Sequence, residues 1–178
     1  MPDAPAIRRA APSESEALCA LLHAAFGAYR GVLVPESGAL RETPASIAER
    51  LAREHVLVAG AEGAPVATVT VERPAPGAVY LGRLAVHPDW QRRGLAERMI
   101  TAGEAMARAE GAAVLALDVR LCLPGNIRLF ERLGFREARR MAHPGFTEPT
   151  FMRMEKRLAG GASEAGASAG LGRGGGEA

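Results

Sequence analysis

Near the start of the chain, apolar residues recur with the spacing of an α-helix. Leu18, Leu22 and Phe26 fall on one face of such a helix. Ser13 and Glu16 are three residues apart, which is the spacing of a capping box. We therefore expect this helix to begin at Ser13.

A second helix is predicted after an irregular stretch. Residues 27–38 contain three glycines and a proline, which favour a loop. Thr43 followed by Pro44 is typical of an N-cap and the first helical position. Ile47 and Leu51 then have the spacing of an inward-facing stripe, so the helix is expected to start at Pro44.

The pattern next changes from helical spacing to alternation. Residues 55–59 and 66–72 predict two strands of a hairpin around a turn at residues 60–63. Residues 79–86 predict a third strand, and Gly82 within it indicates a β-bulge.

The second half of the chain alternates helices with strands. Residues 94–109 predict a long helix, and residues 113–117 form the continuous apolar run of a strand buried on both faces. The remaining predicted elements are a short helix and three strands, at residues 127–133, 6–9, 136–142 and 151–158. The order βααβββαβαββ predicts an α/β (α+β) fold, a mixed central sheet flanked by helices.

Composition sets the class of protein. Of 178 residues 48 % are hydrophobic, enough for a sizeable core, which excludes wholesale disorder. The net charge of +2 is too balanced for a dedicated nucleic-acid binder. We expect one domain over residues 5–158 and a disordered Gly- and Ala-rich tail over residues 159–178.

Two cysteines, Cys19 and Cys122, are too few for a disulfide framework and lack metal-ligand spacing. Apolar runs are too short to span a bilayer. These observations favour a cytoplasmic, bacterial protein with no metal, no membrane partner and no nucleic-acid partner.

The most informative segment is the turn between the third strand and the long helix, Gln91-Arg92-Arg93-Gly94-Leu95-Ala96. A strand that runs through a turn straight into a helix leaves the first helical N–H groups unpaired at the positive end of the helix dipole. Gly94 admits close approach to the backbone, and Arg92 and Arg93 add positive charge. This arrangement predicts a phosphate site.

Two other phosphate motifs do not fit this turn. It has one glycine, whereas a dinucleotide fingerprint needs three, and it lacks the Gly-Lys-Ser/Thr of a P-loop. Taken by itself, the hexapeptide also fits a solvated, arginine-rich turn without a ligand.

The turn resembles the pyrophosphate-binding motif of the GNAT superfamily of N-acyltransferases, Gln/Arg-x-x-Gly-x-Gly/Ala. The strand at residues 84–88, the apolar strand at residues 114–117 and the helix that ends in Leu-Gly-Phe within residues 126–135 resemble neighbouring elements of that family. The order of elements is similar over residues 7–158.

The resemblance implies that acyl-CoA, usually acetyl-CoA, binds where two central parallel strands splay apart. The backbone of Leu84, Ala85 and Val86 would pair with the pantetheine arm, and an N–H there would polarise the thioester carbonyl. The other cofactor-binding residues that it implies are Gln91, Arg92, Arg93, Gly94, Leu95 and Ala96 for the pyrophosphate, and Asn126 and Phe130 on the later helix.

The chemistry implied is direct transfer of the acyl group to an amine acceptor in a ternary complex. Glu72, expected at the end of its strand, is the candidate general base acting through water, and Asp118 is the second candidate. For Glu72 a merely solvated carboxylate is the alternative. Many family members have Tyr where this chain has Phe130, which has no proton for the departing thiolate. A thiol of pKa about 8.5 still leaves well enough for a slower reaction.

The resemblance places the acceptor against residues 29–42 and 146–150. Tyr29, Ser37, Arg41 and Glu42 are the polar candidates there. Small-molecule amines, amino acids and protein N-termini stay open as acceptors, and a homodimer stays open beside a monomer.

Two other functions are alternatives. A non-catalytic acyl-CoA binding or sensing domain is consistent with Phe130. A basic interaction module around Arg139 and Arg140 is disfavoured by the near-zero net charge and the 4 % aromatic content.

Overall fold

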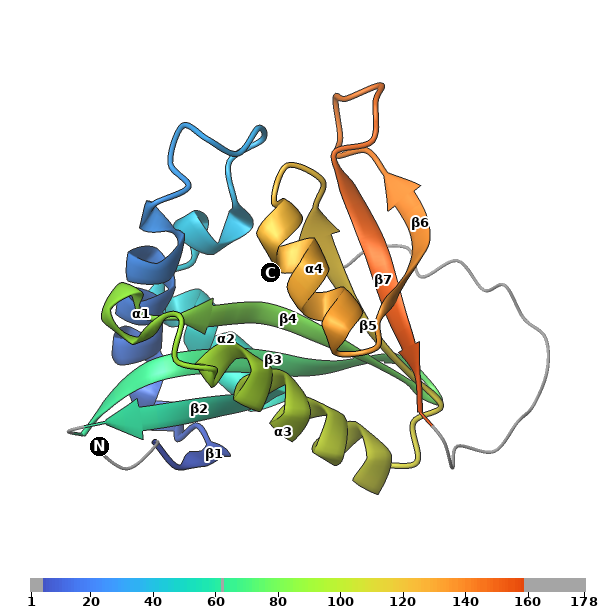
Figure 1. The fold of residues 1–178 in the computed structure, drawn as a ribbon. Coiled ribbons are helices and arrows are strands. Elements are labelled where there is room, and N and C mark those ends of the chain that lie inside the picture. The colour runs from blue at the N-terminus through green and yellow to red at the C-terminus, as the bar shows by residue number, and fades with distance from the viewer. Residues whose placement is uncertain (1–4, 62, 159–178) are drawn as a thin grey trace.

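Seven strands form one sheet with helices on both faces in the computed structural model, which describes residues 5–61 and 63–158 (Figure 1). The strands are β1 (Ile7–Arg9), β2 (His55–Ala61), β3 (Ala64–Ala75), β4 (Ala78–Val86), β5 (Val114–Arg120), β6 (Arg136–Met141) and β7 (Phe151–Arg157). The helices are α1 (Ser15–Gly27), α2 (Pro44–Arg53), α3 (Leu95–Ala109) and α4 (Pro124–Arg132), with the short 3-10 helices η1 (Pro12–Glu14), η2 (Gly38–Arg41) and η3 (Pro88–Trp90). The predicted order of strands and α-helices is confirmed.

The strands lie in the order β1-β2-β3-β4-β5-β7-β6, and among them only β4 and β5 are parallel. Helix α3 supplies the crossover that a parallel pair requires. The pairing of β4 with β5 runs from Ala78 opposite Val114 to Leu81 opposite Leu117 and ends there. Beyond these pairs the two strands part, as the predicted splay requires.

A β-bulge in β4 coincides with this parting. Thr68 of β3 pairs with Ala85 and Thr70 pairs with Gly82, so β4 contains one residue more than β3 over the same stretch. Arg83 lies within the bulge and has a left-handed φ of 51°, which is uncommon for a residue with a side chain. The bulge predicted from Gly82 is therefore present, with its strained residue one position later.

The two faces of the sheet carry separate hydrophobic clusters. On one face, Met99 and Ile100 of α3 are fully buried in a cluster that also contains Val69 of β3 and Leu117 of β5. Each such side chain contributes roughly 1.5–3 kcal/mol relative to exposure. Figure 1 shows α3 and α4 on the near side of the sheet.

The opposite face is covered by α1 and α2 over β2, β3 and the end of β4. Leu22 of α1 and Ile47 of α2 pack in a cluster with Val56, Val58 and Ala85. No helix of comparable packing covers β5, β7 and β6 on this face in the described part of the chain.

The start of α1 differs from the prediction. The helix begins at Ser15 after η1, and Glu14 rather than Glu16 folds back, its Oε2 accepting the N–H of Ala11 at 2.7 Å. Arg8 holds the same carboxylate in an ion pair. The predicted capping box of Ser13 and Glu16 is thus wrong, because a 3-10 turn closed by Glu14 precedes the helix.

The start of α2 agrees with the prediction. Thr43 Oγ1 accepts the N–H of Ser46 at 3.1 Å, and Ser46 Oγ accepts the N–H of Thr43 at 2.9 Å. Strand β3, by contrast, continues through Pro74 to Ala75. Glu72 consequently lies inside β3 and not at its end.

The predicted tail at residues 159–178 lies outside the described residues. In residues 5–61 and 63–158, no helix has the length and apolar character needed to cross a membrane.

Gly103 of α3 marks a close contact between helix and sheet. A Cβ at this position would lie 2.8 Å from Cδ2 of Leu81, the last β4 residue that pairs with β5. Helix propensity alone would make Gly103→Val slightly favourable and Ala105→Val, at an exposed position of the same helix, unfavourable.

We expect the reverse order: Gly103→Val lowers the free energy of unfolding by about 1–3 kcal/mol because the core is overpacked, and Ala105→Val by less than about 1 kcal/mol. Urea unfolding measures both. If Gly103→Val lowered the free energy of unfolding by no more than Ala105→Val does, α3 would not be in close contact with Leu81.

Candidate functional site

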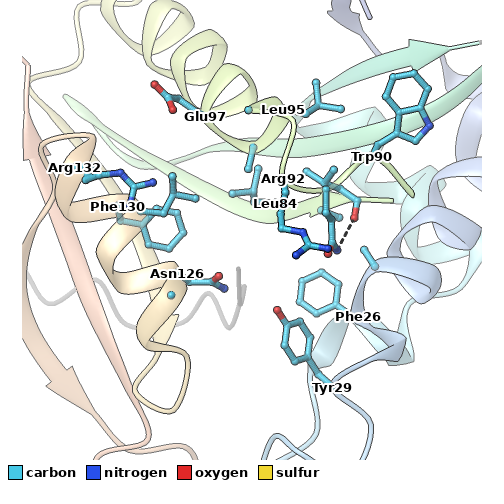
Figure 2. A pocket seen from close by; sticks show the side chains of 18 residues that line it. Phe26, Tyr29, Leu84, Trp90, Arg92, Leu95, Glu97, Asn126, Phe130 and Arg132 are labelled. Atoms are coloured by element: carbon cyan, nitrogen blue, oxygen red, sulfur yellow. Dashed lines mark hydrogen bonds between the residues drawn. The ribbon is translucent and has the colours of Figure 1, made fainter. Parts of the chain in front are cut away.

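A cleft of about 440 Å³ opens where β4 and β5 part. Figure 2 shows it between α4 on one side and the end of α1 on the other, with the start of α3 at its margin. Of the residues predicted to bind a cofactor or substrate, those that line this cleft are Tyr29, Leu84, Ala85, Val86, Gln91, Arg92, Gly94, Leu95, Ala96, Asn126 and Phe130.

Residues Leu84, Ala85 and Val86 form the β4 wall of the cleft. They follow the bulge and lie beyond the last pair with β5, so their β5-facing backbone edge borders the cleft and not a neighbouring strand. The unpaired N–H and C=O groups of such an edge can hydrogen-bond to an extended ligand, as they would to an additional strand.

The turn into α3 forms the margin of the cleft. The Gln91 side chain donates to the carbonyl of Val86 at 3.2 Å, which ties the turn to the strand end. Arg92 and Gly94 both have left-handed φ values, 58° and 75°. The N–H of Arg98 bonds to the carbonyl of Gly94, so the amides of the preceding turn of α3 have no acceptor within the helix.

Two arginines bring positive charge to the cleft, one at its margin and one on its α4 wall. Arg92 comes from the turn and Arg132 from α4, and Glu97 of α3 is the one carboxylate among the lining residues. Arg93 is not among the residues that line the cleft. Its guanidinium lies 5.1 Å from the ring centroid of Trp90 in a cation–π contact.

The α4 wall carries Asn126 and Phe130. Phe130 is 1 % exposed and contacts Phe135 edge to face at 6.2 Å between ring centroids. It therefore closes the cleft as part of the core, and its ring offers no proton.

Tyr29 and Phe26 form the opposite wall, and Figure 2 shows the Tyr29 hydroxyl directed into the cleft. The carbonyl of Tyr29 accepts the N–H groups of Val32 and Leu33, which fixes the end of α1. Tyr29 carries the one hydroxyl among the residues that line this cleft.

Glu72 lies outside the cleft lining, on the face of the sheet that α2 covers. A Cβ at Gly82 would lie 2.8 Å from Glu72 Oε1, so the absence of a side chain at Gly82 makes room for this carboxylate beside the bulge. Burial is the largest cause that raises the pKa of Glu72, and the nearby Glu54 raises it further, while Arg50 and two other arginines oppose both.

Asp118, the second base candidate, is buried in an ion pair. Its Oδ1 and Oδ2 accept from Arg153 Nε at 2.5 Å and Nη2 at 3.0 Å. Arg153 also lies 5.0 Å above the Tyr80 ring. Both oxygens are thus engaged, which favours a fixed carboxylate joining β5 to β7 over a base that takes up a proton.

The structure does not bring the other acceptor candidates into the cleft. Ser37 is fully buried and its Oγ accepts the N–H of Ala39 at 3.2 Å, so it caps η2. Arg41 is exposed on η2 with its guanidinium 3.5 Å from the carbonyl of Glu36. Glu42 is buried in an ion-pair network.

That network contains residues that the sequence prediction overlooked. Arg83 and Arg50 both contact Glu42. The signal for Arg83 was present, because a charged residue in the otherwise apolar stretch 79–86 needs a buried partner. Its partner 41 positions away could not be read from spacing.

Elsewhere, the described residues contain no metal cluster, and a second cavity lies away from the cleft. In the described residues, no three or more His, Cys, Asp and Glu side chains gather as a metal site would require. A second cavity of about 430 Å³ lies at the far end of the β3–β4 hairpin, beside the Arg73–Glu110 ion pair.

Residues 18–135 match the family model described as the acetyltransferase (GNAT) family. The chain belongs to this GNAT acetyltransferase family. A search of curated protein sequences gives no significant match.

The GNAT fold is also shared with solved structures. The PaiA N-acetyltransferase of Thermoplasma acidophilum, in complex with coenzyme A, is 16 % identical with a TM-score of 0.73, covering 86 % of this chain and 98 % of that chain. The yncA protein of Salmonella typhimurium, with its cofactor acetyl-CoA, is 21 % identical with a TM-score of 0.71, covering 93 % and 98 %. The ribosomal-protein alanine N-acetyltransferase of Escherichia coli is 22 % identical with a TM-score of 0.69, covering 92 % and 97 %.

The family match confirms that this GNAT protein is an acyltransferase by class, and the solved structures confirm the predicted mixed sheet. Two of these solved relatives hold coenzyme A or acetyl-CoA.

The buried Asp118–Arg153 pair generates a stability prediction. We expect Asp118→Asn to lower the free energy of unfolding by about 3 kcal/mol or more, because it leaves a buried guanidinium without its counter-charge. Glu137→Gln, which breaks the exposed Glu137–Arg140 pair, should leave the free energy of unfolding nearly unchanged. Urea unfolding measures both, and a small loss for Asp118→Asn would contradict a structural role.

Proposed function

We propose that this GNAT protein transfers the acetyl group of acetyl-CoA to a primary amine of a small molecule or a peptide. The amine attacks the thioester directly while both substrates are bound. The observation that carries the proposal is the cleft at the parting of β4 and β5, which has an unpaired strand edge along one wall and a helix N-terminus at its margin.

The residues of the cleft fit acetyl-CoA in shape and charge. The backbone edge of Leu84–Val86 suits the amide-containing pantetheine arm. The amides that begin α3, with Gln91 to Ala96 around them, suit the diphosphate, and open space around Gly94 permits its close approach. Asn126 and Phe130 would form the opposite wall.

The proposed chemistry needs a polarised carbonyl and a neutral amine. A backbone N–H after the bulge, at Leu84 or Ala85, would donate to the thioester oxygen and stabilise the oxyanion of the tetrahedral intermediate. Glu72 would accept the amine proton through a water molecule. Its raised pKa makes Glu72 a stronger base than an ordinary carboxylate.

The thiolate leaves without a side-chain acid from α4, because Phe130 occupies that position of the cleft wall. A thiol of pKa about 8.5 is a sufficiently good leaving group for this step. Collapse of the tetrahedral intermediate forms the amide bond and breaks the carbon–sulfur bond, and the thiolate takes its proton from solvent.

The acceptor would approach from the side of residues 28–42 and of the β6–β7 loop. Tyr29 lines the cleft from this side, and Arg41 is exposed nearby in the chain. One of the similar structures is named for an acceptor that is a ribosomal-protein alanine, and small-molecule amines fit the same chemistry. The free thiols of Cys19 and Cys122 suit a reducing cytoplasm.

A non-catalytic acyl-CoA sensor is the second candidate, and the buried Phe130 is the observation that favours it. Turnover separates the two. The full chain is incubated with acetyl-CoA and a panel of amines, including peptides with free N-termini, and thiol release is followed. Amine-dependent release supports the transferase. Tight CoA binding with no release on any amine of the panel supports the sensor.

Gly94→Val tests the phosphate site. The valine strains a left-handed position and fills the space that the diphosphate would use, so the dissociation constant for CoA should rise tenfold or more. Gly111→Val, at an exposed position with φ of 74° at the other end of α3, imposes the same backbone strain away from the cleft. Calorimetric titration should show unchanged CoA affinity for this control. Equal affinities for the two variants would count against the site.

Glu72→Gln tests the base. We expect kcat to fall about 100-fold with CoA affinity unchanged. Because a base acts in its deprotonated form, wild-type kcat/KM should rise as the pH increases through the raised pKa of Glu72, above the ordinary value near 4.3. The variant should lack this limb. A variant with wild-type kcat would remove Glu72 from the mechanism.

A further inference from the structure

The bulge residue Arg83 sends its side chain into a buried ion-pair network. Its side chain is 9 % exposed, and its Nε donates to Glu42 Oε1 at 2.9 Å. Arg83 also keeps a left-handed φ of 51°. An uncommon backbone conformation persists only where surrounding contacts hold it, and the ion pair with Glu42 is such a contact for Arg83.

Glu42 is the anchor, and it holds two cations at once. Its side chain is 6 % exposed and lies in the segment between η2 and α2. Besides Arg83, Arg50 Nη2 of α2 donates to Oε1 at 2.8 Å, and the Ser46 hydroxyl donates to Oε2 at 2.5 Å. These contacts lower the pKa of Glu42 despite the cost of burial, so it stays ionised.

The backbone of Glu42 is fixed as well. Its carbonyl accepts from the Nε2 of His23, at 3.0 Å, and from the Cys19 thiol, at 3.4 Å, both on α1. The Glu42 carboxylate is therefore held in place by α1 and α2 together, and not by its own loop alone.

Arg50 is shared among three carboxylates and favours two of them. It donates to Glu42 and, through Nη1 at 3.2 Å, to Glu54, whereas Glu72 Oε1 lies 3.7 Å from the same Nη1. That separation is longer than a hydrogen bond. Glu72 thus lies beside a cation that is committed to other partners.

The other charged and titratable groups that face Glu72 come from several elements. They are Glu54 just after the end of α2, Tyr80 and Arg83 of β4, and Arg153 of β7. Arg153 is committed to Asp118, and Arg83 is committed to Glu42. Arg50, Arg83 and Arg153 are therefore each hydrogen-bonded to a carboxylate other than Glu72.

We propose that Glu42 is a positioning residue for the reaction: by clamping Arg83 and Arg50 it fixes the β4 bulge and keeps both guanidinium groups from hydrogen-bonding to Glu72. This inference rests on the proposed function, in which Glu72 accepts the amine proton. It assigns a role to a residue that touches neither substrate.

The consequence follows from charge competition. Without the charge of Glu42, Arg50 keeps Glu54 as a partner, and Glu72 becomes the other nearby carboxylate for the guanidinium groups of Arg50 and Arg83. A direct ion pair stabilises the ionised form, so the pKa of Glu72 falls and the carboxylate becomes a weaker base. The loss of the negative charge of Glu42 itself also lowers the pKa of Glu72, because a nearby like charge is removed.

Glu42→Gln, made in the full chain, tests the proposal with two measurements. The first is the carboxyl titration of Glu72 by NMR without any substrate, and its pKa should fall by about one unit. The second is the pH profile of kcat/KM, whose acid limb should move down by the same amount while the plateau falls severalfold. Damage to packing alone would lower the plateau without moving the limb.

Glu49→Gln is the matched control. It removes one carboxylate from an exposed position on the same helix, α2, and should leave the Glu72 titration and the pH profile unchanged. In an Arg50→Gln background, the effect of Glu42→Gln should shrink, because one of the two released cations is gone.

An unchanged or higher pKa of Glu72 in Glu42→Gln would overturn the proposal. If Glu42→Gln fails to fold, Glu42→Asp keeps the charge and shortens its reach, and it should lower the pKa of Glu72 by a smaller amount; no change there would also overturn it. A failure of the proposed function gives a different result. Glu72→Gln would then keep its activity, while the pKa of Glu72 in the otherwise wild-type chain would still fall when Glu42 is replaced by Gln.

Discussion

The function proposed for this GNAT protein depends on how soon the parallel pairing of β4 and β5 stops. Four residue pairs hold the two strands together, ending at Leu81 and Leu117. The bulge at Arg83 then turns β4 aside, so the backbone from Leu84 onward borders a cleft and not a strand. A fully paired strand would leave no edge for a ligand, and the helix N-terminus that follows would face a closed sheet.

Several charged side chains are buried near the point where β4 and β5 part, which would be costly without counter-charges. Charged side chains are buried beside the parting, and each has a counter-charge: Glu42 with Arg83, and Asp118 with Arg153. Burying such charges is unfavourable unless they are paired and hydrogen-bonded. Arg50 is hydrogen-bonded to Glu42 and Glu54 and lies 3.7 Å from Glu72, so burial, the largest cause, still raises the pKa of Glu72.

Local pattern was sufficient for much of the fold, including the turn that leads into α3, and insufficient for contacts between distant segments. The cap of α2 at Thr43 and the bulge beside Gly82 follow from neighbouring residues, whereas α1 starts at Ser15 because Glu14 reaches back to Ala11. The burial of Asp118 depends on a partner 35 positions away, which no spacing reveals. The resemblance to the family, not periodicity, identified the cleft.

The most direct test of the parting strands as a CoA site is backbone amide NMR of the chain titrated with CoA. If CoA binds as proposed, the largest chemical-shift changes will fall on Leu84–Val86, along the β4 wall, and on residues 92–97, at the margin of the same cleft. Changes concentrated on residues 73–79, around the second cavity, or the absence of any saturable change would contradict it.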